Sequence, residues 1–290
     1  MQHYWKIITQ IKAIQGNEMK FFFTLGILIL MFNTKSFADT TTYTVSVVPQ
    51  MQTTHIQKTW GKFLEALSEK TNLNFKLKHY ATIPLFEKGL EAGEPDIAFM
   101  NPYHAVMAYD WHKYEPIIHD DKKLVGILVV KKDSDIKSLQ DLQNKTLAFP
   151  SPNAFAASLY MRALLEVEEK ISFKPVYVKT HSNVYRNVLF NTYPAGGGVN
   201  NTLQREPTSV SSKLRILYTT KATAPHPISV HPRVSKELKE KIQNTILAMR
   251  KEARYKAILD EIQVPYPVST SYDKEYKSLK KLNLEKYLAK

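Results

Sequence analysis

Residues 148–158 read Ala-Phe-Pro-Ser-Pro-Asn-Ala-Phe-Ala-Ala-Ser, residues 181–186 read His-Ser-Asn-Val-Tyr-Arg, and residues 194–199 follow with Pro-Ala-Gly-Gly-Gly-Val. The first two stretches place small polar residues where a short apolar strand turns into a helix. At such a turn, free backbone N–H groups and the positive end of the helix point into a cleft, which suits an anion. The sequence therefore predicts a protein that binds a small anionic solute.

Strands and helices alternate along the rest of the chain. Short apolar or β-branched runs predict strands at Tyr43–Val48, Leu73–Leu77, Asp96–Met100, Leu124–Lys131, Thr146–Phe149, Val176–Val178, Ala195–Val199 and Leu214–Tyr218. Apolar residues at helical spacing predict helices at Ile56–Thr71, Ile83–Glu91, Asn153–Val167, Val184–Asn191 and Val234–Arg250, and Asn101-Pro102 opens another. Strand–helix–strand units of this length favour α/β architecture with mostly parallel, doubly wound sheets.

The order of these units predicts two lobes. We expect the first lobe to comprise residues 39–129 and 223–290, and the second to comprise residues 130–222. Strands near 125–131 and 216–230 would cross between the lobes and form a two-strand hinge. In α/β proteins ligands bind at the carboxyl ends of strands, so the cleft between the lobes is the expected binding site.

The N-terminal region has the pattern of a secretory signal peptide. Lys20 precedes an apolar run over residues 21–32, and Ser36-Phe37-Ala38 offers small residues at a cleavage site. We therefore expect residues 1–38 to be removed on export, with Met19 as the natural start. The run is short for a membrane span, although an uncleaved anchor helix is the alternative. No cysteine follows Ala38, which excludes a lipid anchor of the lipoprotein type.

Composition excludes several functional classes. The 290 residues contain no cysteine, which rules out disulfides, thiolate metal sites and a cysteine nucleophile. The formal net charge of +13 favours anionic partners. The lysines are nevertheless interspersed with glutamates on predicted helices, as on a solvated surface. The sequence contains no nucleic-acid-binding motif, so a nucleic-acid partner is not expected.

An enzymatic or metal-dependent function is not expected either. Ser151, His181 and Asp135 could be arranged as a triad, but the sequence has no Gly-x-Ser-x-Gly pattern. No phosphate-binding glycine loop and no zinc motif occurs. His104, His112 and His119 lack the spacing of metal ligands, so we predict no metal and no cofactor. A hydrolase is the remaining enzymatic alternative.

Candidate ligand-binding residues follow the strands of both predicted lobes. Those of the second lobe are Ser151, Asn153, Ala154, His181, Ser182, Asn183, Tyr185 and Arg186, and those of the first lobe are Gln50, Thr53, Asn101 and Tyr103. Asn153 is expected to cap a helix and to present the amides after it, and Arg186 is the candidate for a bidentate contact with an oxyanion. Each candidate also has a purely structural interpretation: it could be a helix cap, a buried hydroxyl with a partner inside the protein, or a guanidinium exposed to solvent.

One segment gives the chain a family resemblance. Residues 94–103, Glu-Pro-Asp-Ile-Ala-Phe-Met-Asn-Pro-Tyr, resemble a signature of the solute-binding proteins of phosphate, phosphite and phosphonate ABC transporters. Residues 176–199 are similar to the second-lobe segment of that family, with a strand, a helix that begins at a histidine and a strand of small residues. The resemblance covers roughly residues 41–260.

The resemblance implies a type 2 periplasmic-binding-protein fold, a location in the periplasm and a permease of the inner membrane as partner. It also implies a monomer and a ligand-binding tyrosine near the second helix, for which Tyr80 is the nearest candidate. The family places a Ser/Thr run where this chain has Ser151-Pro152-Asn153-Ala154, and an acidic residue where it has Pro194.

The candidate solutes are therefore phosphonate, phosphite, phosphate, other oxyanions and small organic acids. A ligand-sensing module that feeds a membrane sensor kinase is the alternative to an importer subunit.

Overall fold

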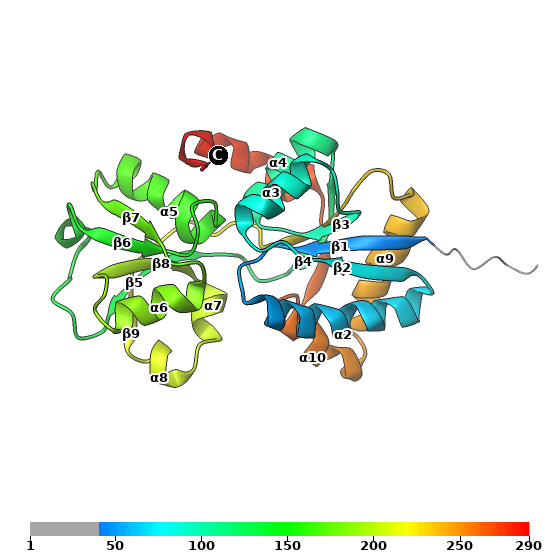
Figure 1. Cartoon of the computed structure of the whole chain (residues 1–290), viewed down its shortest axis with the longest axis horizontal. Coiled ribbons are helices and arrows are strands. Elements are labelled where there is room, and N and C mark those ends of the chain that lie inside the picture. Colours follow the sequence, from blue (N-terminus) through cyan, green and yellow to red (C-terminus); the bar gives the residue numbers. More distant parts are fainter. Residues whose placement is uncertain (1–40, 290) are drawn as a thin grey trace, which may run out of the picture. The chain divides into compact units, whose positions relative to one another are not determined.

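The computed structural model describes residues 41–289, which form one compact unit of two β-sheets with helices around them (Figure 1). The predicted signal peptide at 1–38 and the predicted start at Met19 lie outside the described residues. Within residues 41–289, no helix is long and apolar enough to cross a membrane.

The first sheet has six strands in the order β11-β4-β10-β3-β1-β2. They are β1 (Thr42–Val47), β2 (Asn74–Lys78), β3 (Ile97–Phe99), β4 (Glu115–Asp120), β10 (Pro227–Val230) and β11 (Pro267–Ser269). β1 pairs in parallel with β2 and β3, so Val45 lies opposite Leu77 and Ile97. β10 and β11 pair antiparallel with their neighbours. The carboxyl ends of β1, β2 and β3 therefore meet at one edge of the sheet.

The second sheet has five strands in the order β7-β6-β8-β5-β9. They are β5 (Gly126–Lys131), β6 (Thr146–Phe149), β7 (Lys174–Tyr177), β8 (Ala195–Val199) and β9 (Leu214–Thr219). β6 is parallel to β7 and β8, whereas β5 is antiparallel to β8 and β9. Both sheets are thus mixed, and the expectation of mostly parallel sheets was wrong. β10 and β5, the strands that begin after the two crossings between the sheets, run antiparallel to both of their neighbours.

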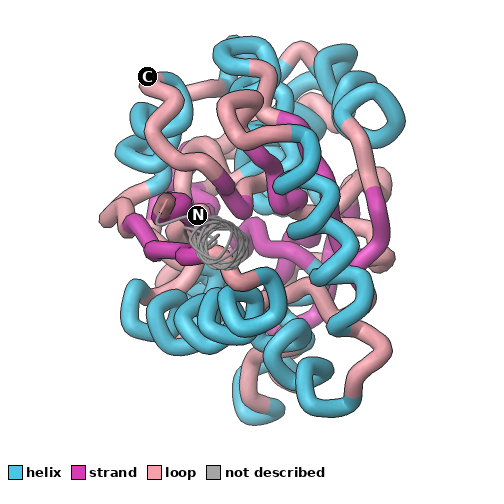
Figure 2. The backbone as a smooth tube through the Cα atoms, turned by 90° about the vertical axis from the view of Figure 1, so that its right-hand side faces the viewer, coloured by secondary structure: helices cyan, strands magenta, loops and turns pink. Residues whose placement is uncertain are grey.

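Helices cover both faces of each sheet, and the strands lie between helices in both views (Figures 1 and 2). At the first sheet, α2 (Thr53–Thr71) packs against α9 (Lys236–Met249) and α10 (Ala253–Glu261), and α3 (Ile83–Glu91) packs against α4 (Pro102–His112). At the second sheet lie α5 (Tyr160–Ala163), α6 (His181–Leu189), α7 (Asn200–Gln204) and α8 (Thr208–Ser211). Residues 155–168 form one continuous helix around α5, with wider π-type turns at its two ends.

Aromatic side chains fill the core beside the first sheet. Trp60 of α2 is almost fully buried, and its ring lies 5.0 Å from that of Phe99 and 5.4 Å from that of Phe63. Burial of side chains this large is the main contribution to the stability of a chain without disulfides.

The chain crosses between the sheets twice, after β4 and after β9, and the two crossing segments pair with each other. Leu124 and Thr223 exchange backbone hydrogen bonds of 3.0 and 2.9 Å, and Thr220 donates to the carbonyl of Gly126. The division into lobes at residues 129/130 and 222/223 stays a prediction. β5, which starts at Gly126, already belongs to the second sheet.

Candidate functional site

Loops from both sheets enclose a small cavity at the carboxyl ends of their parallel strands. We call it the central cavity, and its volume is about 10 Å³, the room of a single water molecule. It is lined by Val48, Gln50, Ile83, Asn101, Leu124, Ala154, Phe155, Ala156, Ala157, His181, Val199 and His226. Gln50 follows β1, Asn101 follows β3, and His181 follows β7. The predicted residues Gln50, Asn101, Ala154 and His181 are thus brought together here.

The start of the helix at residues 155–168 contributes backbone donors to this cavity. The first N–H groups of a helix have no acceptor within it, and Ala154 offers no side-chain cap. Among the described residues, the N–H groups of Phe155, Ala156 and Ala157 donate no hydrogen bond. These amides and the positive end of the helix form a site of positive potential without a charged side chain.

Two glycines hold this helix start against the second sheet. A Cβ atom on Gly197 of β8 would lie 1.9 Å from the carbonyl oxygen of Ala157, and one on Gly126 of β5 would lie 2.2 Å from that of Ala156. Only glycine permits so close an approach of two backbones. The run of glycines at 196–198 is therefore required for packing, and it fixes the position of the three amides.

Two uncharged histidines face the cavity. Burial lowers the pKa of His181 to about 4. Burial, with the neighbouring His104 and His181, lowers the pKa of His226 to about 3. His226 also stacks on Phe99 with 5.5 Å between ring centroids. Each neutral imidazole offers one donor and one acceptor, so both rings can hydrogen-bond an oxyanion near neutral pH.

A larger opening, the outer cleft, adjoins the central cavity through Gln50 and His181. Its volume is about 500 Å³, and all of its lining residues except Met51 carry polar side chains. The lining residues are Gln50, Met51, Gln52, His55, Thr180, His181, Ser182, Asn183, Arg186, Thr202, Arg205, Glu206, Glu261 and Gln263. The predicted residues Ser182, Asn183 and Arg186 thus lie in the outer cleft, not in the central cavity.

Arg186 is already opposed by a carboxylate. Its Nη2 lies 3.8 Å from Oε2 of Glu206, whose side chain is only 7% exposed. The Ser182 hydroxyl donates to the other oxygen of Glu206. Asn183 donates from its amide to the carbonyl of Val178 at 2.8 Å. The charge of Arg186 is therefore partly neutralised, which weakens its attraction for an anionic solute.

Asn101 and Asn153 connect the loops of the two sheets. Asn101 caps α4 by accepting from the N–H of His104 at 2.8 Å, and its Nδ2 donates to the carbonyl of Asn153 at 3.1 Å. Asn153 in turn donates to the buried carboxylate of Glu87 at 2.8 Å and exchanges two hydrogen bonds with the backbone of Ala289. Its side chain is fully used by protein groups.

The other predicted residues do not line the central cavity. The hydroxyls of three predicted tyrosines are hydrogen-bonded to protein groups. Tyr80 donates to Glu94, Tyr103 donates to Glu285, and Tyr185 shares a hydrogen bond with Thr202. Burial raises the pKa of all three. Thr53 is exposed in the first turn of α2. Ser151 is buried near the helix start, and its carbonyl accepts from the N–H of Ala154.

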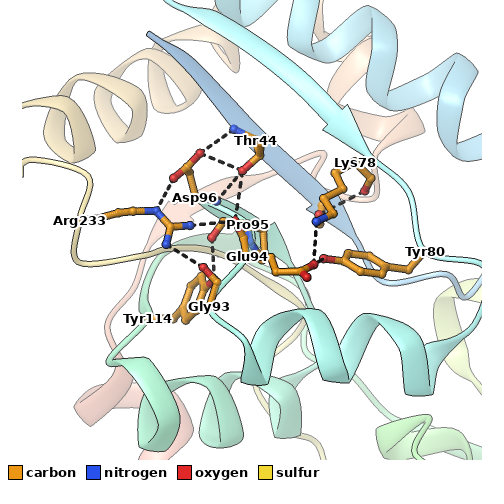
Figure 3. A network of polar contacts seen from close by, with 10 residues as sticks. Thr44, Lys78, Tyr80, Gly93, Glu94, Pro95, Asp96, Tyr114 and Arg233 are labelled. Carbon is orange, nitrogen blue, oxygen red and sulfur yellow. Dashed lines mark hydrogen bonds and ion pairs between the residues drawn. The ribbon is translucent and has the colours of Figure 1, made fainter.

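Asp96, the acidic residue of the Asp-Ile-Ala segment, lies immediately before β3 and has a structural role (Figure 3). Its carboxylate accepts from the N–H of Thr44 at 2.7 Å and from Nε of Arg233 at 2.5 Å. Arg233 also donates to the carbonyls of Gly93 and Glu94. Burial alone would raise the pKa of Asp96, but these hydrogen bonds outweigh it and hold that pKa below its usual value. The network joins β1, β3 and the segment after β10.

A third opening, of about 260 Å³, lies beside the crossing segments, where Lys122, Lys123 and Arg205 contribute positive charge. It shares Leu124 and His226 with the central cavity. Arg205 is paired with Asp260 at 3.0 Å. Within residues 41–289, no group of histidine and carboxylate side chains could hold a metal ion.

The comparisons with known proteins agree with this architecture. Residues 45–276 match the family model described as ABC transporter, phosphonate, periplasmic substrate-binding protein. The chain belongs to this family. Its members are solute-binding proteins of ABC transporters and not enzymes, so the predicted solute-binding role is confirmed. No curated protein matches the sequence.

Several solved structures share the fold at low sequence identity. A binding protein component of an ABC phosphonate transporter from Pseudomonas aeruginosa is 16% identical, with a TM-score of 0.76 over 84% of this chain and 86% of that one. A Prochlorococcus marinus protein in complex with methylphosphonate is 17% identical, with a TM-score of 0.74 over 83% and 97%. A Xanthomonas citri protein bound to ATP is 12% identical, with a TM-score of 0.71 over 86% and 99%. The type 2 periplasmic-binding-protein fold is confirmed.

Proposed function

We propose that this protein captures a small phosphorus oxyanion between its two sheets and delivers it to a permease of the inner membrane. A phosphonate, phosphite or phosphate group would accept hydrogen bonds from the amides of Phe155, Ala156 and Ala157. Support comes from the family and, above all, from these three unpartnered donors beside His181 and His226.

We also infer that the protein is exported as a monomer with two lobes. Residues 1–38 act as a cleaved signal peptide without a lipid anchor, and the mature monomer works in the periplasm. Residues 39–129 with 223–290 form one lobe, and residues 130–222 form the other. The crossing segments at Leu124 and Thr223 act as the hinge, because paired strands can bend while their hydrogen bonds persist.

The size of the central cavity supports a hinge motion. A volume of about 10 Å³ holds one water molecule and is too small for a phosphonate group. The lobes must therefore separate for the solute to enter and close around it afterwards. In this scheme backbone amides and neutral imidazoles take over from the hydroxyl donors of the family's Ser/Thr run, whose place is held here by Ser151-Pro152-Asn153-Ala154.

The test is calorimetric titration of residues 39–290 with methylphosphonate, phosphite and phosphate, with sulfate and acetate for comparison. We expect binding of at least one phosphorus oxyanion, weakened at least about tenfold by His181→Ala because a donor to the anion is lost. Arg186→Ala should change the affinity less than about threefold, since Glu206 already opposes that charge.

His112→Ala is the matched control. His112 hydrogen-bonds to the carbonyl of Glu91 and lines none of the three openings. A folded protein that binds none of the phosphorus compounds would contradict the proposed solute. Equal loss of affinity in the His112 and His181 variants would contradict the proposed site.

A further inference from the structure

The C-terminal residues 284–289, which we call the C-terminal clasp, lie across helices of both sheets (Figure 1). The match to the family model ends at residue 276, before the clasp begins. Three short helical turns, Tyr272–Tyr276, Lys277–Leu282 and Leu284–Tyr287, lead the chain along α4 towards the helix at 155–168. Leu284 is fully buried, so the clasp is packed against the protein and is not a loose tail.

On the side of the first sheet, the clasp is held through α4. The hydroxyl of Tyr103 donates to Oε1 of Glu285 at 2.7 Å, and the preceding turn adds an ion pair of 2.7 Å between Lys280 and Asp110. Tyr103 is 2% exposed, so its bond to Glu285 is formed by a rigid, buried ring. These contacts fix the start of the clasp to one half of the molecule.

On the side of the second sheet, the clasp contacts Arg162 and Asn153. Arg162, which is 7% exposed, donates to the carbonyl of Tyr287 at 3.0 Å and to that of Pro152 at 2.9 Å. Its guanidinium group also lies over the ring of Tyr287 at 5.8 Å. Ala289 donates to Oδ1 of Asn153 at 2.9 Å and accepts from its Nδ2 at 3.1 Å.

These contacts require that the two halves stay close together. Tyr103 lies in α4 beside the first sheet, and Asn153 lies in the loop after β6 of the second sheet. A hinge opening that separated them would break the bonds to Glu285 or to Ala289. Contacts that exist only in the closed state shift the equilibrium towards it, by an amount equal to their differential free energy. We propose that the C-terminal clasp stabilises the closed state and slows the release of solute.

The first experiment measures closure without any solute, so it is independent of the proposed ligand. The chain has no cysteine, and spin labels on Lys58→Cys and Lys174→Cys report the distance between the two halves. Both lysines are exposed and lie in α2 and β7, respectively. We expect one narrow distance distribution for the full chain and a broader distribution at longer distances after deletion of residues 284–290.

Point variants keep the test valid if the deletion does not fold. Ala289→Pro removes the N–H that bonds to Asn153, and Glu285→Ala removes the acceptor of Tyr103. The double variant should give the same shift as the deletion. Lys286→Ala is the matched control, because Lys286 is exposed and its ammonium group lies over the ring of its neighbour Tyr287, with no hydrogen bond or ion pair to another residue of 41–289. Unchanged distributions in the folded double variant would overturn the proposal.

The second experiment measures release of a bound phosphorus oxyanion by stopped-flow. We expect the double variant to raise the release rate at least about tenfold, because two hydrogen bonds of the closed state are lost, with little change in the association rate. Equal release rates in the double variant and the Lys286→Ala control would also overturn the proposal. Absence of solute binding in the full chain would contradict the proposed function and leave the distance measurement decisive for the clasp.

Discussion

His181 combines a position in the central cavity with an unusually low pKa. Its side chain is charged only below a pH of about 4 in the folded protein, whereas an exposed histidine takes up a proton near pH 6.5. The unfolded chain therefore binds this proton first. The stability contributed by neutral His181 is fully present above pH 6.5 and is lost as the pH falls towards 4.

We predict that this one group removes about 3 kcal/mol of unfolding free energy between pH 6.5 and pH 4. Urea unfolding of the native protein and of His181→Gln at several pH values measures the difference directly. The variant should lose less stability than the native protein over this range. Parallel curves for the two proteins would contradict the buried, uncharged state of His181.

Substitution of Asp96 should lower the stability of the protein without changing its affinity for solute. Asp96→Asn should lower the unfolding free energy by about 2 kcal/mol at pH 7, because charged hydrogen bonds to Arg233 and Thr44 are weakened. Solute affinity should be unchanged, since Asp96 precedes β3 and the central cavity lies beyond its other end. Chemical denaturation and calorimetry check the two statements, and a loss of affinity at unchanged stability would refute them.

The sequence predicted part of the lining of the central cavity because four of the lining residues come shortly after the end of a strand. Gln50, Asn101, Ala154 and His181 share that feature and line the central cavity. His226 was missed because it lies in a proline-flanked extended segment, which carries no signal of its own. Tyr103 was expected to reach the cleft, but its hydroxyl contacts Glu285, a partner 182 positions away that no local pattern could reveal.

At the scale of elements, the helix at 155–168 depends on the glycines beneath it. Gly197→Ala should destabilise the protein by about 2 kcal/mol and weaken solute binding, because the new Cβ would displace the carbonyl of Ala157 and the amides near it. Gly61→Ala is the control, since no atom lies within 4 Å of its new Cβ in α2. That substitution should instead stabilise the protein by about 0.5–1 kcal/mol.

Thermal unfolding of both glycine variants, with calorimetry for solute affinity, decides this prediction. Gly197→Ala with native stability and native affinity would show that the helix start can shift without consequence. A destabilised Gly61→Ala protein would indicate that the comparison measures something other than the close approach at β8.

Elements with regular apolar patterns were predicted well. The strands Thr146–Phe149 and Ala195–Val199 have the boundaries that were expected from the sequence. β4 was missed because it contains Pro116 and ends at Asp120, both typical of turns. α10 and β11 were also missed, since charged residues and prolines dominate residues 250–269. Tertiary packing, not local propensity, decides these elements.

At the scale of the whole molecule, polar contacts join the two halves on both sides of the central cavity. Arg205 and Asp260 pair on one side, and Glu87, Asn153 and the C-terminal clasp meet on the other. The chain thus adopts a closed arrangement, with the three amides of residues 155–157 inside it. We propose that these amides bind the solute.

Nuclear magnetic resonance of ¹⁵N-labelled protein during titration with methylphosphonate observes each of these amides individually. We predict that the largest downfield shifts of amide protons occur at Phe155, Ala156 and Ala157, because each gains a hydrogen bond to an oxyanion. Shifts confined to the opening at Lys122 and Lys123, with these three amides unchanged, would place the solute elsewhere and contradict its binding by the amides.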